Sequence, residues 1–262
     1  MWSLRAWRYR RLLRRARIPD AIWAQVREAF PVLDGLSADE DARLRDLTTL
    51  FLHEKTLEPA GDLVLDETMR VAIAAQACLP ILNLGLDWYD GWSAVIVYPA
   101  EFVPRLEWTD EAGVVHTAEE VRSGEAWQYG PVILSWDDVQ ASGAGDGYNV
   151  VIHEFAHKLD ARNGHTEGLP PLHRDMDVRE WSSRFAAAFE DLNARVARGE
   201  EPAIDPYAGE APEEFFAVTS EYFFEIPDIL HATYPEVYAL LRRFYRQDPL
   251  ARLAPHRVAP GG

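Results

Sequence analysis

The stretch VVIHEFAHKLD, residues 150–160, contains the motif His153-Glu154-x-x-His157 and decides the fold class that we expect. Its apolar side chains and the glycine-rich break at 142–147 predict a largely buried helix that begins near Tyr148. Histidines four positions apart project from one helix face, close enough to bind one Zn²⁺ ion. The glutamate between them can accept a proton from the metal's water. The motif therefore predicts a zinc site with Glu154 as general base.

The burial expected for this helix supports a metal site over an accidental match. In a chain of this composition the pattern arises by chance only about 0.02 times. Three ionisable groups within an apolar helix need partners, because burying an unpaired polar group is costly, and a divalent cation is such a partner. A structural or accidental motif remains the alternative.

A third protein ligand must come from elsewhere in the chain, since a catalytic zinc ion takes three protein ligands and keeps one open position. The extended motif would place a third histidine at position 163, which is Asn163 here. His165 and His173 lie in a proline- and glycine-rich loop, and Glu180 begins a helix that is expected to be exposed. These three residues are weaker candidates.

The segment PEEFFAVTSEYFF, residues 212–224, offers a better ligand. Glu214 and Glu221 are seven positions apart, which returns them to nearly the same angle on a helix rich in aromatic residues. Two carboxylates on such a stripe are costly unless they are paired or bound to metal. Glu213 falls on the neighbouring face, where an acid merely suits the helix dipole.

The composition limits the class of protein. The chain has 262 residues, 48% of them hydrophobic, which excludes a disordered tail protein. A net charge of -17 argues against nucleic-acid binding by the body of the protein. The single cysteine, Cys78, cannot form an internal disulfide, and no apolar run approaches the ~20 residues of a membrane span. We therefore expect a cytoplasmic protein.

The first seventeen residues oppose this charge balance, because they contain seven arginines and no acid. An arginine-rich helix that carries Trp2 and Trp7 could lie on an anionic membrane or bind an acidic partner. Alternatively, it packs on the acidic body of its own chain.

Helical patterns flank a small sheet in the sequence. Helices are expected at 20–30, from Ser37 to Glu54 with a capping box, and from Asp66 to Ala77, and the last at about 235–246. Strands are expected at 94–98, at 132–136 and, in short form, at 113–116. This order predicts a mostly helical α+β fold with a small mixed sheet and no boundary that divides the chain.

Three motifs in the chain resemble the Mlc titration factor A family of zinc-dependent peptidases, whose catalytic core is similar to that of the anthrax lethal factor. They are VIHEFAHKLDARNG (151–164), DPYAGEAPEEFFAVTSEYFF (205–224) and FYRQDPL (244–250). The resemblance covers most of the chain and is weakest at the N-terminus. It implies one zinc metallopeptidase domain over residues 1–262, with a basic segment at 1–17 and a zincin-like (gluzincin) active-site core at about 90–250.

The resemblance also implies the roles of individual residues. His153, His157 and Glu214 would bind one zinc ion per chain, Glu154 would be the general base, and Tyr207 would stabilise the oxyanion. Without the resemblance, Tyr207 would be an ordinary loop tyrosine. Because Glu213 and Glu214 are adjacent where the family needs one acid, the ligand assignment depends on the register.

The function that follows is peptide hydrolysis, with exo- and endopeptidase action both open and aminopeptidase action included. Asp160 and Glu221 are candidates to accept hydrogen bonds from the histidine N–H groups that zinc does not use. Asp160 could equally be a helix C-terminal residue before Asn163-Gly164. The strand at 132–136 could be a sheet edge that holds an extended peptide, or it could be internal. The rival hypothesis is a regulatory protein that sequesters a transcriptional repressor, with the zinc site secondary.

Overall fold

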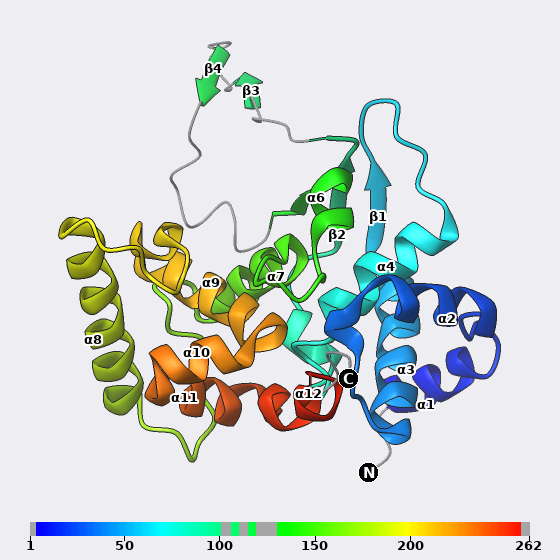
Figure 1. Ribbon diagram of the computed structural model, residues 1–262. Helices are drawn as coiled ribbons and strands as arrows, with labels where there is room; N and C mark the ends of the chain where they lie inside the picture. The colour runs from blue at the N-terminus through cyan, green and yellow to red at the C-terminus, as the bar shows by residue number, and fades with distance from the viewer. Residues whose placement is uncertain (1–3, 101–105, 110–114, 119–129, 258–262) are drawn as a thin grey trace, which may run out of the picture.

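The computed structural model describes residues 4–100, 106–109, 115–118 and 130–257, which are mostly helical with a small parallel sheet (Figure 1). Before the sheet's last strand lie four helices, namely α1 (Leu4–Leu13), α2 (Asp20–Ala29), α3 (Ala38–Glu54) and α4 (Glu67–Cys78). After it lie α6 (Trp136–Ala141), α7 (Val150–Asp160), α8 (Val178–Ala197), α9 (Pro212–Glu225), α10 (Pro227–Thr233), α11 (Pro235–Tyr245) and α12 (Pro249–Arg257). Short 3-10 helices are η1 (Pro31–Leu33), η2 (Leu86–Tyr89), η3 (Ala161–Asn163) and η4 (Pro206–Gly209).

The sheet contains β1 (Thr56–Pro59), β2 (Ala94–Tyr98) and β5 (Val132–Ser135) in the order β1-β2-β5, and both pairings are parallel. The expectation of a mixed sheet is therefore wrong. The chain between β1 and β2 passes through α4, and such a crossover returns the second strand in the same direction as the first. The antiparallel pairing is confined to a separate ribbon of β3 (Leu106–Thr109) and β4 (Val115–Ala118).

The strand expected at 94–98 is β2, and the strand expected at 132–136 is β5, after which Trp136 begins α6. Of the short strand expected at 113–116, positions 113–114 lie outside the described residues, and β4 begins at position 115. β1 was not predicted because only Leu57 of its four residues is buried, which leaves no alternating pattern. Among the described strands, β5 lies at an edge of the sheet.

The predicted helices agree with the structure at their starts. Ser37 accepts a hydrogen bond from Glu40 N and the Glu40 side chain bonds back, so the capping box before α3 is confirmed. Asp66 caps α4, and Asn149 caps α7. The prediction that α11 would be the last helix is wrong, since α12 follows it after a three-residue break that begins with the left-handed Arg246.

α7 lies near the centre of Figure 1, between α1–α4 on the right and α8–α11 on the left. Its buried Phe155 makes ring contacts with Phe51 of α3, with Tyr89 of η2 and with Trp92. α7 also packs against α9. Because its apolar side is fixed from several directions, the side that bears the histidines has a defined orientation.

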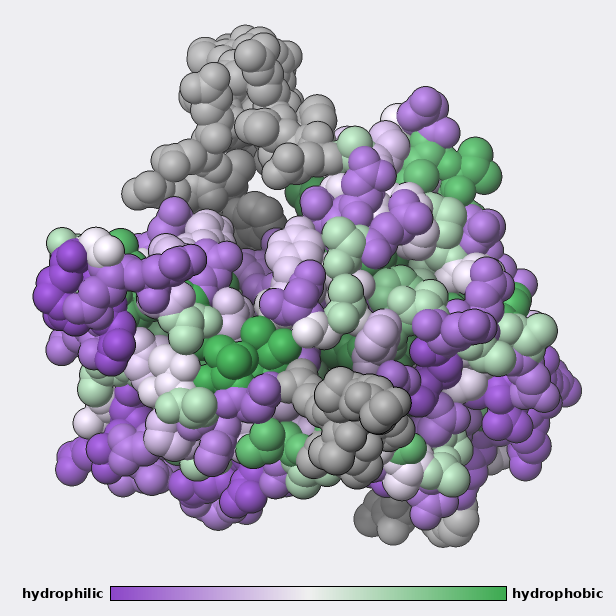
Figure 2. Space-filling model, in the orientation of Figure 1, coloured by the Kyte–Doolittle hydropathy of each residue, from purple (hydrophilic) through white to green (hydrophobic). Residues whose placement is uncertain are grey.

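The basic N-terminal helix packs on the body of the chain. α1 contacts α3, and its Arg5 forms ion pairs with Glu54, Asp87 and Asp90. This agrees with the alternative in which the segment binds its own acidic body. Hydrophilic residues cover most of the face shown in Figure 2. No helix among the described residues is long and apolar enough to cross a membrane.

Candidate metal centre

The two histidines of the motif face each other on α7. His153 and His157 are both partly buried, and their Nε2 atoms lie 3.2 Å apart. Asn149 fixes the start of the helix, because its Oδ1 accepts a hydrogen bond from Ile152 N at 2.9 Å. The helical turn that carries His153 therefore begins at Asn149, which caps the helix and is fully buried.

Glu214, in the first turn of α9, completes the group. Its Oε2 lies 3.1 Å from His153 Nε2, and its Oε1 lies 3.5 Å from His157 Nε2. Each of the three residues offers one potential ligand atom, and these three atoms all lie within 4.8 Å of one another. Glu213 is not in this group, which agrees with the sequence argument that placed it on a neighbouring helix face.

The donor set suits a metal ion. Glu214 Oε2 is buried, and its one close polar neighbour given among the described residues is His153 Nε2, at 3.1 Å. His153 Nδ1 donates to Glu221 Oε1 at 2.8 Å, so the neutral ring presents the lone pair of Nε2 to the group. Two imidazole nitrogens and one carboxylate are the ligand types that a catalytic zinc ion takes.

The three groups also perturb one another's ionisation. Burial disfavours the charged form of His153, but the Glu214 and Glu221 carboxylates outweigh burial and raise the pKa of His153 to about 10. Burial disfavours the charged form of Glu214, but the two imidazoles hold its pKa well below the ordinary value. Metal binding to the metal-free group would therefore displace a proton from an imidazole.

Glu221 positions His153, as the sequence suggested. One carboxylate oxygen accepts the hydrogen bond from His153 Nδ1, and the other accepts from Asn149 N at 2.6 Å. Glu221 is 4% exposed, so these bonds form in a nearly dry environment. A carboxylate that accepts from the outer nitrogen of a metal-binding histidine fixes its orientation and tautomer.

A further layer behind Glu221 was not predicted. Asn149 Nδ2 donates to Gln76 Oε1 at 2.9 Å and to Glu225 Oε1 at 2.8 Å, while Glu225 Oε2 accepts from Gly145 N at 2.8 Å. Burial raises the pKa of Glu225 to about 7. The sequence did contain a signal, because Glu225 follows Glu221 by four positions and so lies on the same helix stripe.

Of the two roles expected for Asp160, the structure agrees with that of a helix C-terminal residue, because Asp160 is the last residue of α7. This residue is fully buried, and its Oδ2 accepts a hydrogen bond from Gly168 N at 2.7 Å rather than one from a histidine. Gly168 O in turn accepts from Trp181 Nε1 of α8. Gly168 has φ +70°, and an added Cβ would lie 2.4 Å from Pro212 O. This glycine allows the close approach that joins the end of α7 to the start of α9.

Glu154 and Tyr207 lie beside the three-residue group. Glu154 is partly buried, and its carboxylate forms no hydrogen bond or ion pair with the part of the chain that the structure describes. The Tyr207 ring lies 6.0 Å from the His153 ring and is 45% exposed. Burial and the Glu214 carboxylate raise the pKa of Tyr207 well above its ordinary value, which keeps the phenol protonated. Asp205 holds this turn by accepting from Tyr207 N at 2.9 Å.

The remaining candidate ligands are elsewhere. His173 Nε2 donates to Phe244 O at 2.8 Å, and its ring stacks on Phe244. Glu180 pairs with Arg243 on the exposed side of α8. His165 is exposed in the loop after α7. Within the described ranges, the one group able to hold a metal ion is the one formed by α7 and α9.

Comparison with known proteins gives consistent matches over nearly the whole chain. Residues 4–246 match the family described as glucose-regulated metallo-peptidase M90. Mlc titration factor A of Enterobacter sp. (strain 638) is 43% identical over 239 residues, which cover 90% of each chain. Mlc titration factor A of Cronobacter sakazakii is 44% identical over 86% of each chain. The protein of that name from Yersinia pestis (strain Pestoides F) is 41% identical, with 88% of this chain and 87% of the relative covered.

Proposed function

The chain belongs to the glucose-regulated metallopeptidase family M90, and from this membership we propose that it is a zinc-dependent peptidase with a zincin-like core. The observation that supports the proposal most is the convergence of His153, His157 and Glu214, with Glu154 adjacent on α7. A purely structural zinc site has four protein ligands and does not need such a glutamate. In this proposal the whole chain forms one catalytic domain.

His153, His157 and Glu214 would hold one zinc ion per chain. When bound, zinc would supply Lewis-acid chemistry, polarising the scissile carbonyl and lowering the pKa of a water molecule. Glu214 remains ionised in this site, and Glu221 keeps His153 in the required tautomer. The protein itself therefore keeps Glu214 ionised and His153 oriented, and zinc binding would displace the proton that the imidazole carries in the metal-free group.

Glu154 and Tyr207 would perform the proton chemistry. Glu154 is free of hydrogen bonds to the described residues, so its carboxylate can accept a proton from the attacking water and pass it to the leaving amine. The protonated phenol of Tyr207 can donate a hydrogen bond to the oxyanion that develops on the substrate. Its partial exposure leaves the hydroxyl accessible to a substrate.

A peptide substrate could bind along β5. This strand pairs with β2 on one side, and it contacts α7. An exposed strand edge can bind an extended peptide through backbone hydrogen bonds. Binding there would place a peptide beside the helix that carries Glu154.

Metal removal tests the proposal directly. We expect a chelator such as 1,10-phenanthroline to abolish hydrolysis of a fluorogenic peptide library, and one equivalent of Zn²⁺ per chain to restore it. Zinc content is measured by mass spectrometry on the same samples. Undiminished hydrolysis by protein shown to contain no metal would disprove the proposal.

Tyr207→Phe separates the oxyanion role from binding. The substitution keeps the ring and removes only the hydroxyl, so we expect kcat to fall about a hundredfold for one lost oxyanion donor. KM and zinc content should change little, because the bond forms mainly in the transition state. Tyr222→Phe is a matched control, since its hydroxyl accepts from Asp205 N in the same loop. A wild-type kcat in Tyr207→Phe would show that another group stabilises the oxyanion.

Sequestration of a partner is the alternative function. The relatives are named for titration of Mlc, and this chain could likewise bind a transcriptional repressor, with the zinc site secondary. Peptide turnover distinguishes the two functions. A binding protein would retain its partner complex after metal removal and would hydrolyse no peptide in either state.

A further inference from the structure

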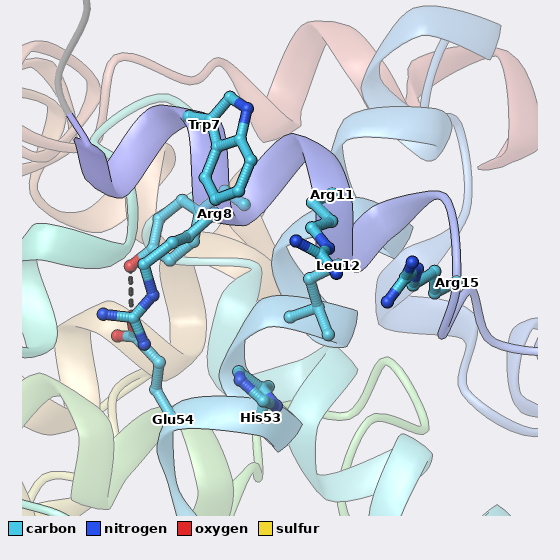
Figure 3. Close-up of a pocket in the computed structure, with 8 residues that line it drawn as sticks. Trp7, Arg8, Arg11, Leu12, Arg15, His53 and Glu54 are labelled. Atoms are coloured by element: carbon cyan, nitrogen blue, oxygen red, sulfur yellow. Dashed lines mark hydrogen bonds between the residues drawn. The ribbon is translucent and has the colours of Figure 1, made fainter.

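A pocket of about 290 Å³ lies between α1 and the C-terminal end of α3, away from the metal-binding group (Figure 3). We call it the arginine pocket. None of its residues belongs to α7, α9 or η4. Those that matter to its chemistry are Trp7, Arg8, Arg11, Leu12, Arg15 and His53.

Three guanidinium groups line this pocket without a protein counter-charge. Arg8, Arg11 and Arg15 form no ion pair with a carboxylate in the described part of the chain. Glu54, the carboxylate that lines the pocket, is already bonded to Arg5 and to the Tyr9 hydroxyl.

An ordinary solvent-exposed helix surface does not account for the close grouping of these three arginines. A spacing of three positions brings Arg8 and Arg11 to one side of α1, and Arg15, in the turn after the helix ends, lines the same pocket, so their like charges repel one another. The partial negative charge at a helix C-terminus does stabilise a nearby cation. This stabilisation is about 0.3–1 kcal/mol at an exposed site, and a single arginine is enough to obtain it. A bound anion would relieve the repulsion among all three.

An aromatic surface adjoins these charges. Trp7 is 51% exposed, and the Arg11 guanidinium lies 5.6 Å from its ring centroid. The indole therefore offers a face for a flat organic group next to the guanidinium side chains.

The surroundings argue for a compact ligand. Tyr9, Leu12 and Leu13 pack against the core, so these side chains of α1 are not available to insert into a bilayer. The net charge of -17 on the chain repels extended polyanions such as nucleic acid or an anionic membrane. A small anion in the pocket meets only one lining carboxylate, that of Glu54, whose charge is already paired with Arg5. Guanidinium groups match phosphate geometry through paired N–H donors.

We propose that the arginine pocket binds a small phosphorylated molecule, whose phosphate contacts Arg8, Arg11 and Arg15 and whose organic part stacks on Trp7. The site is independent of the proposed peptidase chemistry, because the two share no residue.

Calorimetric titration of the full chain with phenyl phosphate, a phosphate monoester that carries a ring, tests this site. We expect saturable binding of one phenyl phosphate per chain, with inorganic phosphate binding more weakly. Arg11→Gln should weaken phenyl phosphate binding at least tenfold, and Trp7→Ala should reduce its affinity to that of inorganic phosphate. Arg14→Gln is the matched control, because it removes the same charge from the same segment without lining the pocket.

Three results would overturn the proposal. The first is absence of saturable phenyl phosphate binding by protein whose circular dichroism shows it to be folded. The second is an equal loss of affinity in Arg14→Gln and Arg11→Gln, which would indicate general charge attraction. The third is binding of phosphatidylglycerol vesicles or of poly-glutamate in the absence of phenyl phosphate binding, which would indicate a macromolecular partner.

Discussion

Glu154→Gln is expected to lose peptide hydrolysis while its zinc content stays at one ion per chain. Glutamine is nearly isosteric with glutamate, and Glu154 is not one of the three residues that converge as potential metal ligands. The amide cannot accept and release a proton as a carboxylate does. General acid–base catalysis contributes about 10²–10⁴-fold to a rate, and kcat should fall by that order. Parallel measurement of kcat and zinc content checks both parts.

Glu190→Gln is a suitable control, because it makes the same chemical change at an exposed position of α8. It should leave both quantities unchanged. If Glu154→Gln hydrolyses peptides at the wild-type rate, the peptidase proposal fails and sequestration of a partner becomes the better hypothesis. Loss of zinc together with activity would mean instead that Glu154 helps to hold the metal.

Glu214→Ala should lose most of its bound zinc. The substitution removes the carboxylate that lies 3.1 Å from His153 Nε2 and 3.5 Å from His157 Nε2, which leaves two protein ligands. Loss of an outer partner of a ligand already costs about 10–100-fold in metal affinity, and loss of the ligand itself should cost more. Competition with a chromogenic zinc chelator measures the affinity, and thermal unfolding of the metal-free proteins shows whether the fold is retained.

Glu213→Ala is the matched control for this experiment, since it removes an adjacent carboxylate from the same helical turn. Wild-type zinc affinity in Glu214→Ala, with a loss in Glu213→Ala or Glu180→Ala, would show that a different acid completes the site. These experiments do not involve the arginine pocket, so their failure would leave that proposal untouched.

Much of the metal-binding group could be predicted because its spacing is local. The four-residue interval between His153 and His157 and the seven-residue interval between Glu214 and Glu221 each define one face of a single helix. Side-chain oxygen caps at Ser37 and Asp66 likewise mark helix starts within a few residues of sequence. Patterns of this kind do not depend on how distant elements pack.

The parts that escaped prediction depend on such packing. The strand at 56–59 exposes three of its four residues, so only its pairing with β2 makes it a strand. The parallel direction of the sheet follows from the path of the chain. Gln76 carries no signal at all, because its amide matters only through Asn149, which lies 73 positions away. The two roles expected for Asp160 stayed equal because nothing in the local sequence shows that Gly168 N donates to its carboxylate.

The buried side chain of Asn149 has a consequence for metal exchange. This side chain forms three hydrogen bonds simultaneously: to the first turn of α7, to Gln76 of α4 and to Glu225 of α9. The first turn of α7 therefore cannot fray without breaking bonds to two other helices. The empty protein keeps its ligands near their final places, and zinc can leave and return as an exchange event rather than as a folding transition.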